Sequence, residues 1–127
     1  MYKFNKKIIE TKFGHRLIVN MLENNKNIGK TIVGFKKFKP DATLYNIEIN
    51  DLFQSKGNGS LLLNYTEHTL YNYGIKKINA TVYQKPLENT VNFYIKNGYL
   101  YHSLEYPTKT YDNGDEIIDL IRMYKDL

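Results

Sequence analysis

A glycine-containing turn between two regular segments is the clearest candidate for chemistry in this sequence. It reads Gln54, Ser55, Lys56, Gly57, Asn58, Gly59, Ser60, and it follows a strand-like segment and precedes a helix-like one. Glycines let a backbone turn tightly and approach a ligand closely. The unpaired amides of a first helical turn present partial positive charge to an anion. The turn therefore predicts a site that cradles phosphate.

Other phosphate-binding patterns fit less well. A Walker loop needs Lys followed by Ser or Thr, and no such pair comes after Gly59. The run from Gly29 to Thr31 has that ending, but Asn24 stands where the first glycine belongs. A dinucleotide fingerprint needs a third glycine, which is missing. An ordinary loop remains the alternative, in which the side chains of Asn58 and Ser60 cap the helix.

The composition is that of a globular protein. The 127 residues are 42% hydrophobic and 24% charged, so we expect one domain over residues 1–127. Purely apolar runs fall far short of the roughly 20 residues that a membrane span needs, and the start of the chain lacks the apolar core of a signal peptide. We therefore expect a cytoplasmic protein with no membrane partner.

The net charge and the absence of cysteine limit the kinds of ligand that the protein is expected to bind. The formal charge of +5 favours anionic partners, but the lysines form short groups instead of one basic tail, so we expect a phosphorylated cofactor and not nucleic acid. The run from Phe35 to Lys39 mixes aromatic and basic residues as nucleic-acid surfaces do, although strand alternation explains it without a ligand. Without cysteine, thiolate metal sites are excluded. Since His15, His68 and His102 show no metal-ligand spacing, we expect no metal site.

The first half of the chain predicts strands. Three β-rich segments separated by turn clusters indicate an antiparallel meander. We expect strands at Tyr2 to Glu10, Arg16 to Glu23 and Thr31 to Lys39, with turns at Lys12 to His15 and Asn24 to Gly29. Pro40 then interrupts the pattern, and Thr43 to Asn50 predicts a fourth strand. Its alternation sets one face against another, apolar face: Leu44, Asn46 and Glu48 against Tyr45, Ile47 and Ile49.

Two helices are predicted after the turn. The first spans Ser60 to Tyr73 and ends at Gly74. The second starts at Pro86 and carries an apolar stripe. The stripe consists of Leu87, Val91 and Ile95. The remaining predicted strands are Ile75 to Tyr83 and a closing pair, Tyr99 to Tyr106 and Glu116 to Tyr124, with a turn at Asp112 to Gly114. This order predicts an α/β (α+β) fold: a mixed, mostly antiparallel sheet of six to seven strands flanked by two main helices.

Three short motifs occur in the order and at the separations of a known superfamily. Gln54 to Gly59 satisfies the pattern Gln/Arg-x-x-Gly-x-Gly/Ala. Asp41 to Ile47 is similar to a strand of the bacterial N-terminal-alanine acetyltransferases of ribosomal proteins, and Asn92 to Tyr99 is similar to a Tyr-x-x-x-Gly-Phe helix end. From about Gly29 to Leu127 the chain thus resembles the GNAT superfamily of acyl-CoA-dependent N-acyltransferases.

The resemblance implies acetyl-CoA as cofactor and assigns roles to residues. It implies that the amides of the turn bind the CoA pyrophosphate, with Gln54 and Lys56 at its edge, and that the end of the fourth strand pairs with the pantetheine arm. The Ile49 amide would polarise the thioester carbonyl, and Tyr94 would protonate the departing thiolate as general acid. The implied cofactor-binding residues are Ile47, Ile49, Gln54, Ser55, Lys56, Gly57, Asn58, Gly59, Ser60, Asn89 and Tyr94.

The chain also departs from the family pattern. Val82 stands where the ribosomal-protein enzymes carry a glutamate base, and Leu87 stands where an asparagine often faces CoA. Glu48, the carboxylate near the end of the fourth strand, is therefore the candidate base. Lys12 to His15 leaves room only for a turn where family members insert one or two helices. We expect an open acceptor groove that suits a protein amine, or a groove completed by a second subunit of a homodimer.

These expectations give two functional hypotheses. The first is transfer of an acetyl group from acetyl-CoA to a primary amine of a protein or other bulky acceptor, by direct attack in a ternary complex. The second is a non-catalytic CoA-binding or protein-interaction module with a GNAT-like fold.

Overall fold

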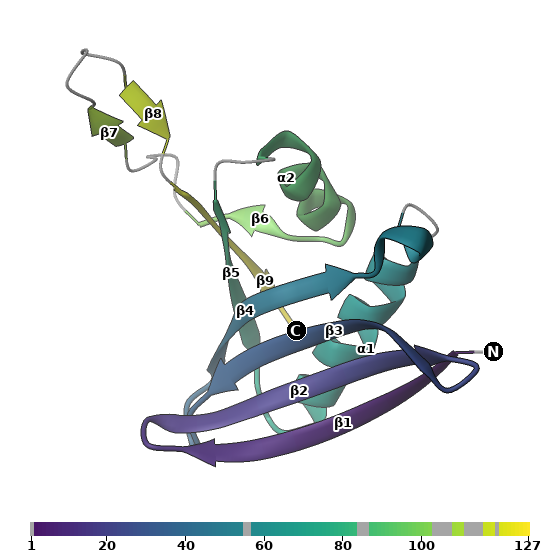
Figure 1. The fold of residues 1–127 in the computed structure, drawn as a ribbon. Coiled ribbons are helices and arrows are strands. Elements are labelled where there is room, and N and C mark those ends of the chain that lie inside the picture. Colours follow the sequence, from purple (N-terminus) through teal and green to yellow (C-terminus); the bar gives the residue numbers. More distant parts are fainter. Residues whose placement is uncertain (1, 55–56, 84–86, 103–107, 111–115, 119) are drawn as a thin grey trace. The chain divides into compact units, whose positions relative to one another are not determined.

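The chain forms a mostly antiparallel sheet with two helices, as predicted (Figure 1). The computed structural model describes residues 2–54, 57–83, 87–102, 108–110, 116–118 and 120–127. Seven strands pair in the order β1-β2-β3-β4-β5-β9-β6, and β7 and β8 form a separate two-stranded sheet. The chain divides into two compact units, Met1–Ile78 with Asp126–Leu127, and Asn79–Lys125.

The first unit begins with the predicted meander. Its strands are β1 (Tyr2–Thr11), β2 (Gly14–Glu23), β3 (Lys26–Phe35) and β4 (Asp41–Ile49), and each neighbouring pair is antiparallel. Only two residues join β1 to β2, and the next hairpin turns at Asn24 and Asn25, whose φ values of 51° and 66° lie in the left-handed region. Two asparagines suffice for such a turn. The turn predicted to reach Gly29 was therefore too long, and β3 starts five residues earlier than Thr31.

A β-bulge in β4 overturns the predicted alternation of that strand. Ile32 pairs with Asn46 but Val33 pairs with Leu44, so Tyr45 is the extra residue. Thr31, which pairs with Ile47, bonds to Thr66 of the helix that covers this face. Val33 and Leu44 lie two residues further along, on the same side. Leu44 therefore shares the covered face with Ile47 and Ile49, and Tyr45 lies over Gly34 on the other face.

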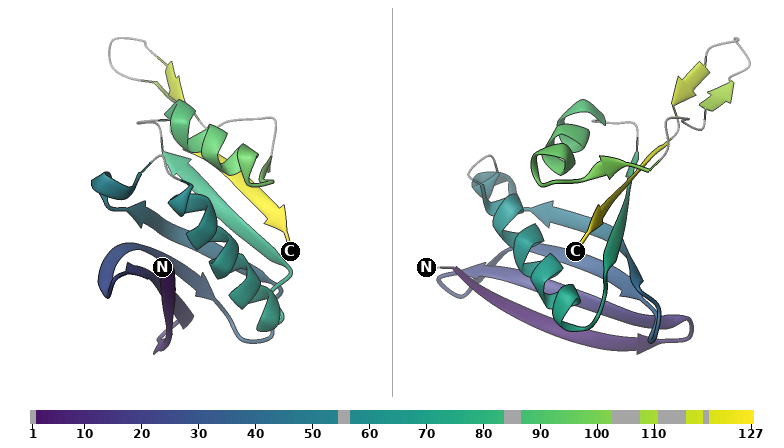
Figure 2. Two further views of the ribbon diagram at one scale, coloured as in Figure 1. Left: turned by 90° about the vertical axis from the view of Figure 1, so that its right-hand side faces the viewer. Right: turned by 180° about the vertical axis from the view of Figure 1, so that it is seen from behind.

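Helix α1 (Asn58–Asn72) packs on that covered face and makes the core of the first unit (Figure 2). The Thr66 hydroxyl donates to the Leu62 carbonyl at 2.9 Å, so the Thr31 hydroxyl donates to Thr66 at 2.7 Å. This bond fixes the helix to β3 inside the core. The buried apolar residues around it are Leu17, Val19, Met21, Ile28, Val33, Ala42, Leu44, Leu62, Leu63, Leu70 and Ile75.

The second unit takes up most of β5 (Lys77–Tyr83) and the elements that follow it. These are α2 (Leu87–Lys96), β6 (Leu100–Tyr101), β7 (Thr108–Thr110), β8 (Glu116–Ile118) and β9 (Leu120–Asp126). The long closing pair predicted from the sequence is instead a short pairing of β6 with β9 plus the β7–β8 hairpin. In the predicted stripe of α2, Val91 is buried but Ile95 is 45% exposed, because Tyr94 takes the inward position. Pro86 and the turn predicted at Asp112 to Gly114 lie outside the described residues.

Both helices end in the same hydrogen-bonded motif. The Ile75 amide donates to the Leu70 carbonyl and the Gly74 amide to the Tyr71 carbonyl, both at 3.0 Å. In α2 the Tyr99 amide donates to the Tyr94 carbonyl at 2.9 Å and Gly98 to Ile95 at 3.0 Å. Gly74 and Gly98 have φ values of 89° and 91°. These are Schellman motifs, in which a left-handed glycine lets two amides satisfy the last helical carbonyls.

Candidate active site

The start of α1 is built to expose backbone amides. Gly57 precedes the helix with φ 79°, and no side chain caps this end. The first turn carries no acidic residue. Within the described part of the chain, no hydrogen bond occupies the amides of Asn58 and Gly59. Such amides, at the positive end of a helix dipole, suit an anion. Ser55 and Lys56, which the sequence also places in the site, lie outside the described residues.

The side chain of Asn58 bonds the start of α1 to the segment that precedes it. Its side chain is 1% exposed, and its amide nitrogen donates to the Phe53 carbonyl at 2.9 Å. Its Oδ1 atom is buried and has no partner among the described residues. Buried polar atoms are nearly always paired, so this oxygen marks a position where a donor from outside the described chain is favoured.

Gln54 is engaged within the chain. A 3-10 turn, η1 (Asp51–Phe53), leads from β4 to the helix. The Gln54 side-chain nitrogen donates to the Ile49 carbonyl at 2.9 Å and to Asp51 Oδ1 at 3.1 Å. Gln54 therefore holds the end of β4 to the connection that precedes α1, a role that the sequence pattern did not reveal.

The end of β4 directs backbone groups away from β3. The Asn50 amide donates to the Ile28 carbonyl at 2.7 Å, so pairs 28/50, 30/48 and 32/46 are the hydrogen-bonded ones in this antiparallel ladder. The intervening residues, Ile47 and Ile49, turn their amides and carbonyls to the opposite edge of β4. The bond from Gln54 to the Ile49 carbonyl agrees with this direction. The Ile49 amide thus has the orientation needed to polarise a carbonyl beside that edge.

Glu48 lies on the face of β4 away from α1. It alternates with Ile47 and Ile49, and its carboxylate lies 3.6 Å from the Lys30 ammonium. The two side chains are 58% and 40% exposed, so solvent screens this pair and it contributes little to stability. The carboxylate remains accessible from that face.

Tyr94 lies in the last turn of α2 and is 5% exposed. Burial raises the pKa of its phenol to about 12, so it is a neutral hydrogen-bond donor throughout the physiological range. Its ring packs on Tyr99 with centroids 5.1 Å apart. Asn89 lies in the same helix and is exposed.

The structure thus brings Ile47, Ile49, Gln54 and the start of α1 together in the first unit, whereas Tyr94 and Asn89 belong to the second. A family profile described as Acetyltransferase (GNAT) family matches residues 2–99. The chain belongs to the GNAT acetyltransferase family. A GNAT acetyltransferase uses an acyl-CoA, and the family predicted from the sequence is confirmed. Comparison with curated proteins gives no match.

Solved GNAT structures share the fold. An acetyltransferase of the family from Elizabethkingia anophelis, with acetyl-CoA bound, has a TM-score of 0.71 at 21% identity and covers 88% of this chain and 76% of its own. The IAA acetyltransferase from Bacillus cereus has a TM-score of 0.73 at 17% identity, covering 98% and 100%. The ribosomal-protein-S18-alanine N-acetyltransferase from Escherichia coli has a TM-score of 0.76 at 16% identity, covering 99% and 94%. At such identities the likeness shows the fold alone.

This GNAT chain has no helix between β1 and β2, as predicted from the short turn between them. Val82, which stands where the resemblance to the ribosomal-protein enzymes implies a glutamate base, is 2% exposed in β5. Among the described residues no cluster of His, Asp or Glu could hold a metal ion, and no helix in that part of the chain has the length and apolarity to cross a bilayer.

Proposed function

We propose that this GNAT protein transfers an acetyl group from acetyl-CoA to a primary amine by direct attack in a ternary complex. The observation that carries the proposal is the pairing of two features in one unit: amides at the start of α1 that have no partner in the described part of the chain, and the amide of Ile49, which points away from β3. Gln54 links the two through its bond to the Ile49 carbonyl. A diphosphate on the helix amides would thereby place a thioester arm beside the C-terminal end of β4, near the Ile49 amide.

The residues present fit CoA as a substrate. Gly57 allows the left-handed turn, and a Cβ built on it meets no atom within 4 Å, so space for a phosphate is not blocked there. The proposed phosphate contacts are the amides of Ser55 to Ser60, with the Lys56 ammonium adding charge. Gln54 and Asn89 complete the proposed cofactor set.

In the proposed reaction the amine nitrogen attacks the thioester carbonyl carbon. The Ile49 amide stabilises the negative charge that develops on the carbonyl oxygen. The carbon–sulfur bond then breaks, the amine proton is lost, and the thiolate leaves. Glu48 is the proposed proton acceptor, because its carboxylate is exposed on the open face of β4.

Tyr94 would act on the thiolate chiefly as a hydrogen-bond donor. Its pKa of about 12 exceeds the roughly 8.5 of an ordinary thiol, so complete proton transfer to sulfur would cost about 5 kcal/mol by that difference. A strong hydrogen bond to the developing thiolate avoids this cost. The released thiolate then takes a proton from solvent or from the protonated form of the base and becomes the free thiol of CoA.

A bulky amine acceptor suits the short β1–β2 connection. Because no helix follows β1, the face of the sheet that carries Glu48 lacks the wall that would enclose a small metabolite. We therefore propose a protein or peptide amine as acceptor, on a monomer or on a homodimer that completes the groove.

The test combines calorimetry with a thiol-release assay on a panel of peptide amines. We expect acetyl-CoA to bind and to turn over. Gly57→Glu should weaken binding at least 100-fold through charge repulsion, and Tyr94→Phe should slow turnover about 100-fold with unchanged CoA affinity. Tyr71→Phe, on the exposed side of α1, is the matched control. Binding without thiol release for any amine would favour the non-catalytic module, and unchanged CoA binding by Gly57→Glu would remove the phosphate site.

A further inference from the structure

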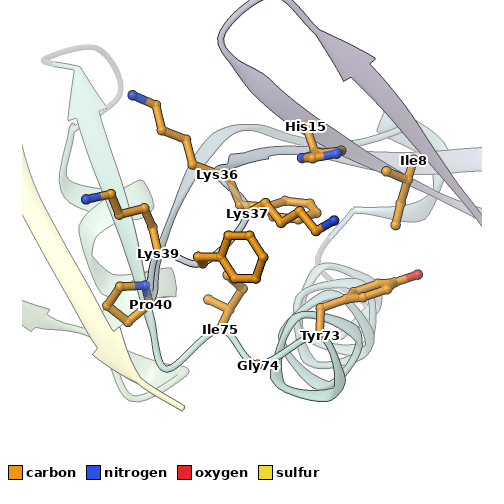
Figure 3. A pocket seen from close by; sticks show the side chains of 11 residues that line it. Ile8, His15, Lys36, Lys37, Lys39, Pro40, Tyr73, Gly74 and Ile75 are labelled. Atoms are coloured by element: carbon orange, nitrogen blue, oxygen red, sulfur yellow. The ribbon is translucent and has the colours of Figure 1, made fainter.

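A second pocket lies at the opposite end of α1 from the proposed phosphate site. It has a volume of about 630 Å³. Its walls come from β1, β2, the β3–β4 turn and the end of α1, all in the first unit (Figure 3). We call it the α1-end pocket; its lining residues are Ile8, His15, Phe35, Lys36, Lys37, Phe38, Lys39, Pro40, Tyr73, Gly74 and Ile75. The 15 residues of α1 span about 22 Å, so this pocket is separate from the start of the helix.

One wall of the α1-end pocket is a row of stacked rings. The His15 and Phe35 rings lie 5.4 Å apart at 20°, and the Phe35 and Tyr73 rings lie 6.1 Å apart at 21°. Tyr73 is 49% exposed, so the row ends in a ring that a further planar group can join. The Nδ1 atom of His15 is buried and has no hydrogen-bond partner among the described residues. His15 therefore forms the buried end of the row, and Tyr73 forms the accessible end.

The mouth of the pocket is positively charged. Lys36, Lys37 and Lys39 all line it, and none of the described lining residues is acidic. In Figure 3, Lys37 extends toward the side of Ile8 and Tyr73, whereas Lys36 and Lys39 extend toward the other side. Ammonium groups on flexible stems bind phosphate as point charges.

Phe38 has a left-handed backbone conformation, which is unfavourable for a phenylalanine. The Lys39 amide donates to the Lys36 carbonyl at 3.1 Å and closes a four-residue turn, in which Phe38 has φ 67°. Glycine or asparagine is preferred at that position. The Phe38 ring is 93% exposed, and the Lys37 ammonium lies 5.4 Å from its centroid. A strained, exposed aromatic residue beside a cationic pocket indicates a ring kept for an external partner.

We propose that the α1-end pocket binds a small ligand of the mononucleotide class, a planar base that carries phosphate. The base stacks on the exposed rings of Tyr73 and Phe38, and the lysines of the β3–β4 turn neutralise the phosphate. The concave shape and the volume are those of a small-molecule site. Because the three lysines belong to one turn and form no stripe across the sheet, a free nucleotide fits better than a nucleic-acid strand.

The test is a titration of the full chain with AMP in the absence of CoA, because the adenosine phosphate of CoA would compete for the same pocket. Phe38→Gly is the decisive variant. It should weaken AMP binding at least tenfold through lost stacking, while its thermal stability stays equal or rises because glycine relieves the strained turn. Its affinity for CoA at the start of α1 should not change. Phe13→Gly is the matched control, since Phe13 is an exposed ring (77%) in the neighbouring β1–β2 turn, and it should leave AMP binding intact.

Further probes separate the contributions of base and phosphate. Adenosine and inorganic phosphate should each bind at least tenfold more weakly than AMP. Lys37→Gln removes one charge and should weaken AMP binding several-fold. His15→Phe changes the buried end of the stacked row and should leave AMP binding unchanged. The proposal is overturned if AMP fails to bind at millimolar concentration, or if Phe38→Gly leaves its affinity unchanged. It is also overturned if a mixed single-stranded oligonucleotide binds far more tightly than AMP with a steep salt dependence.

Discussion

Both ends of α1 carry a left-handed glycine, but the hydrogen bonding of the backbone differs between them. Each end has a glycine in the left-handed region, Gly57 at φ 79° and Gly74 at φ 89°, and a Cβ on either would meet no atom within 4 Å. At the C-terminal end, two amides satisfy the last carbonyls. At the N-terminal end, no side chain caps the helix, and in the described part of the chain the amides of Asn58 and Gly59 stay unoccupied.

This difference shows that the N-terminal end of α1 lacks a stabilising cap. An N-terminal cap contributes about 1 kcal/mol, and the first turn of α1 does without it. Asn58, whose residue type commonly caps helices, points its side chain back to Phe53 instead. The helix is held by its core contacts and its C-terminal motif, so its first turn remains available for a ligand.

The largest expected effect concerns the end of α2. In the Schellman motif there, the Tyr94 carbonyl accepts the bond that the Leu70 carbonyl accepts in α1. Burial raises the pKa of Tyr94 from 10.0 to about 12, so the folded state holds the phenol proton more tightly than the unfolded chain. This contribution to stability is complete below about pH 10 and is lost as the pH rises to about 12, for a total of roughly 3 kcal/mol.

Urea unfolding of the wild type at pH 8 and at pH 11 measures about half of this loss, because pH 11 lies midway between the two pKa values; Tyr94→Phe is the comparison. The variant should have a flatter pH dependence above pH 10. An equal decline in both proteins would mean that the phenol is not the group responsible.

A smaller effect separates the two glycines. Gly57→Ala and Gly74→Ala should each lower the free energy of unfolding by about 1 to 2 kcal/mol, because alanine resists a left-handed φ. Only Gly57→Ala should also weaken CoA binding in calorimetry. Loss of CoA affinity in both variants would show that the affinity follows overall stability and not the geometry of one helix end.

The smallest effect adds charge to the open end. Leu61 lies in the first turn of α1 and is 46% exposed. Leu61→Glu should stabilise the helix by about 0.5 kcal/mol through its dipole, and should weaken CoA binding a few-fold at low salt. Leu61→Gln is the neutral control. If both variants bind CoA equally, electrostatics at this end does not govern its affinity.

Much of the fold was predictable from local patterns. Short β-rich segments between Asn- and Gly-containing turns predicted the meander, and Gly74 and Gly98 predicted both helix ends, because these signals depend on backbone conformation near one residue. The bulge at Tyr45 was not predictable, since it depends on how β3 and β4 pair. The predicted alternation, and with it the facing of Leu44, failed at that residue.

The candidate site was predictable in part for the same reason. The glycine turn before α1 has a local signature, whereas the roles of Gln54 and Asn58 depend on partners that the motif does not specify. The sequence pattern that corresponds to the α1-end pocket was less specific. The run from Phe35 to Lys39 was visible, but His15 and Tyr73 join it only through the sheet register and the end of α1.

The extra residue in β4 also determines how this strand can change length. Deleting Tyr45 would remove the bulge and restore strict alternation, with Leu44, Ile47 and Ile49 still on the covered face and Asn46 and Glu48 on the other. A single-codon deletion at this position should therefore keep the core of the first unit covered and remove only the local bend that the bulge gives the strand.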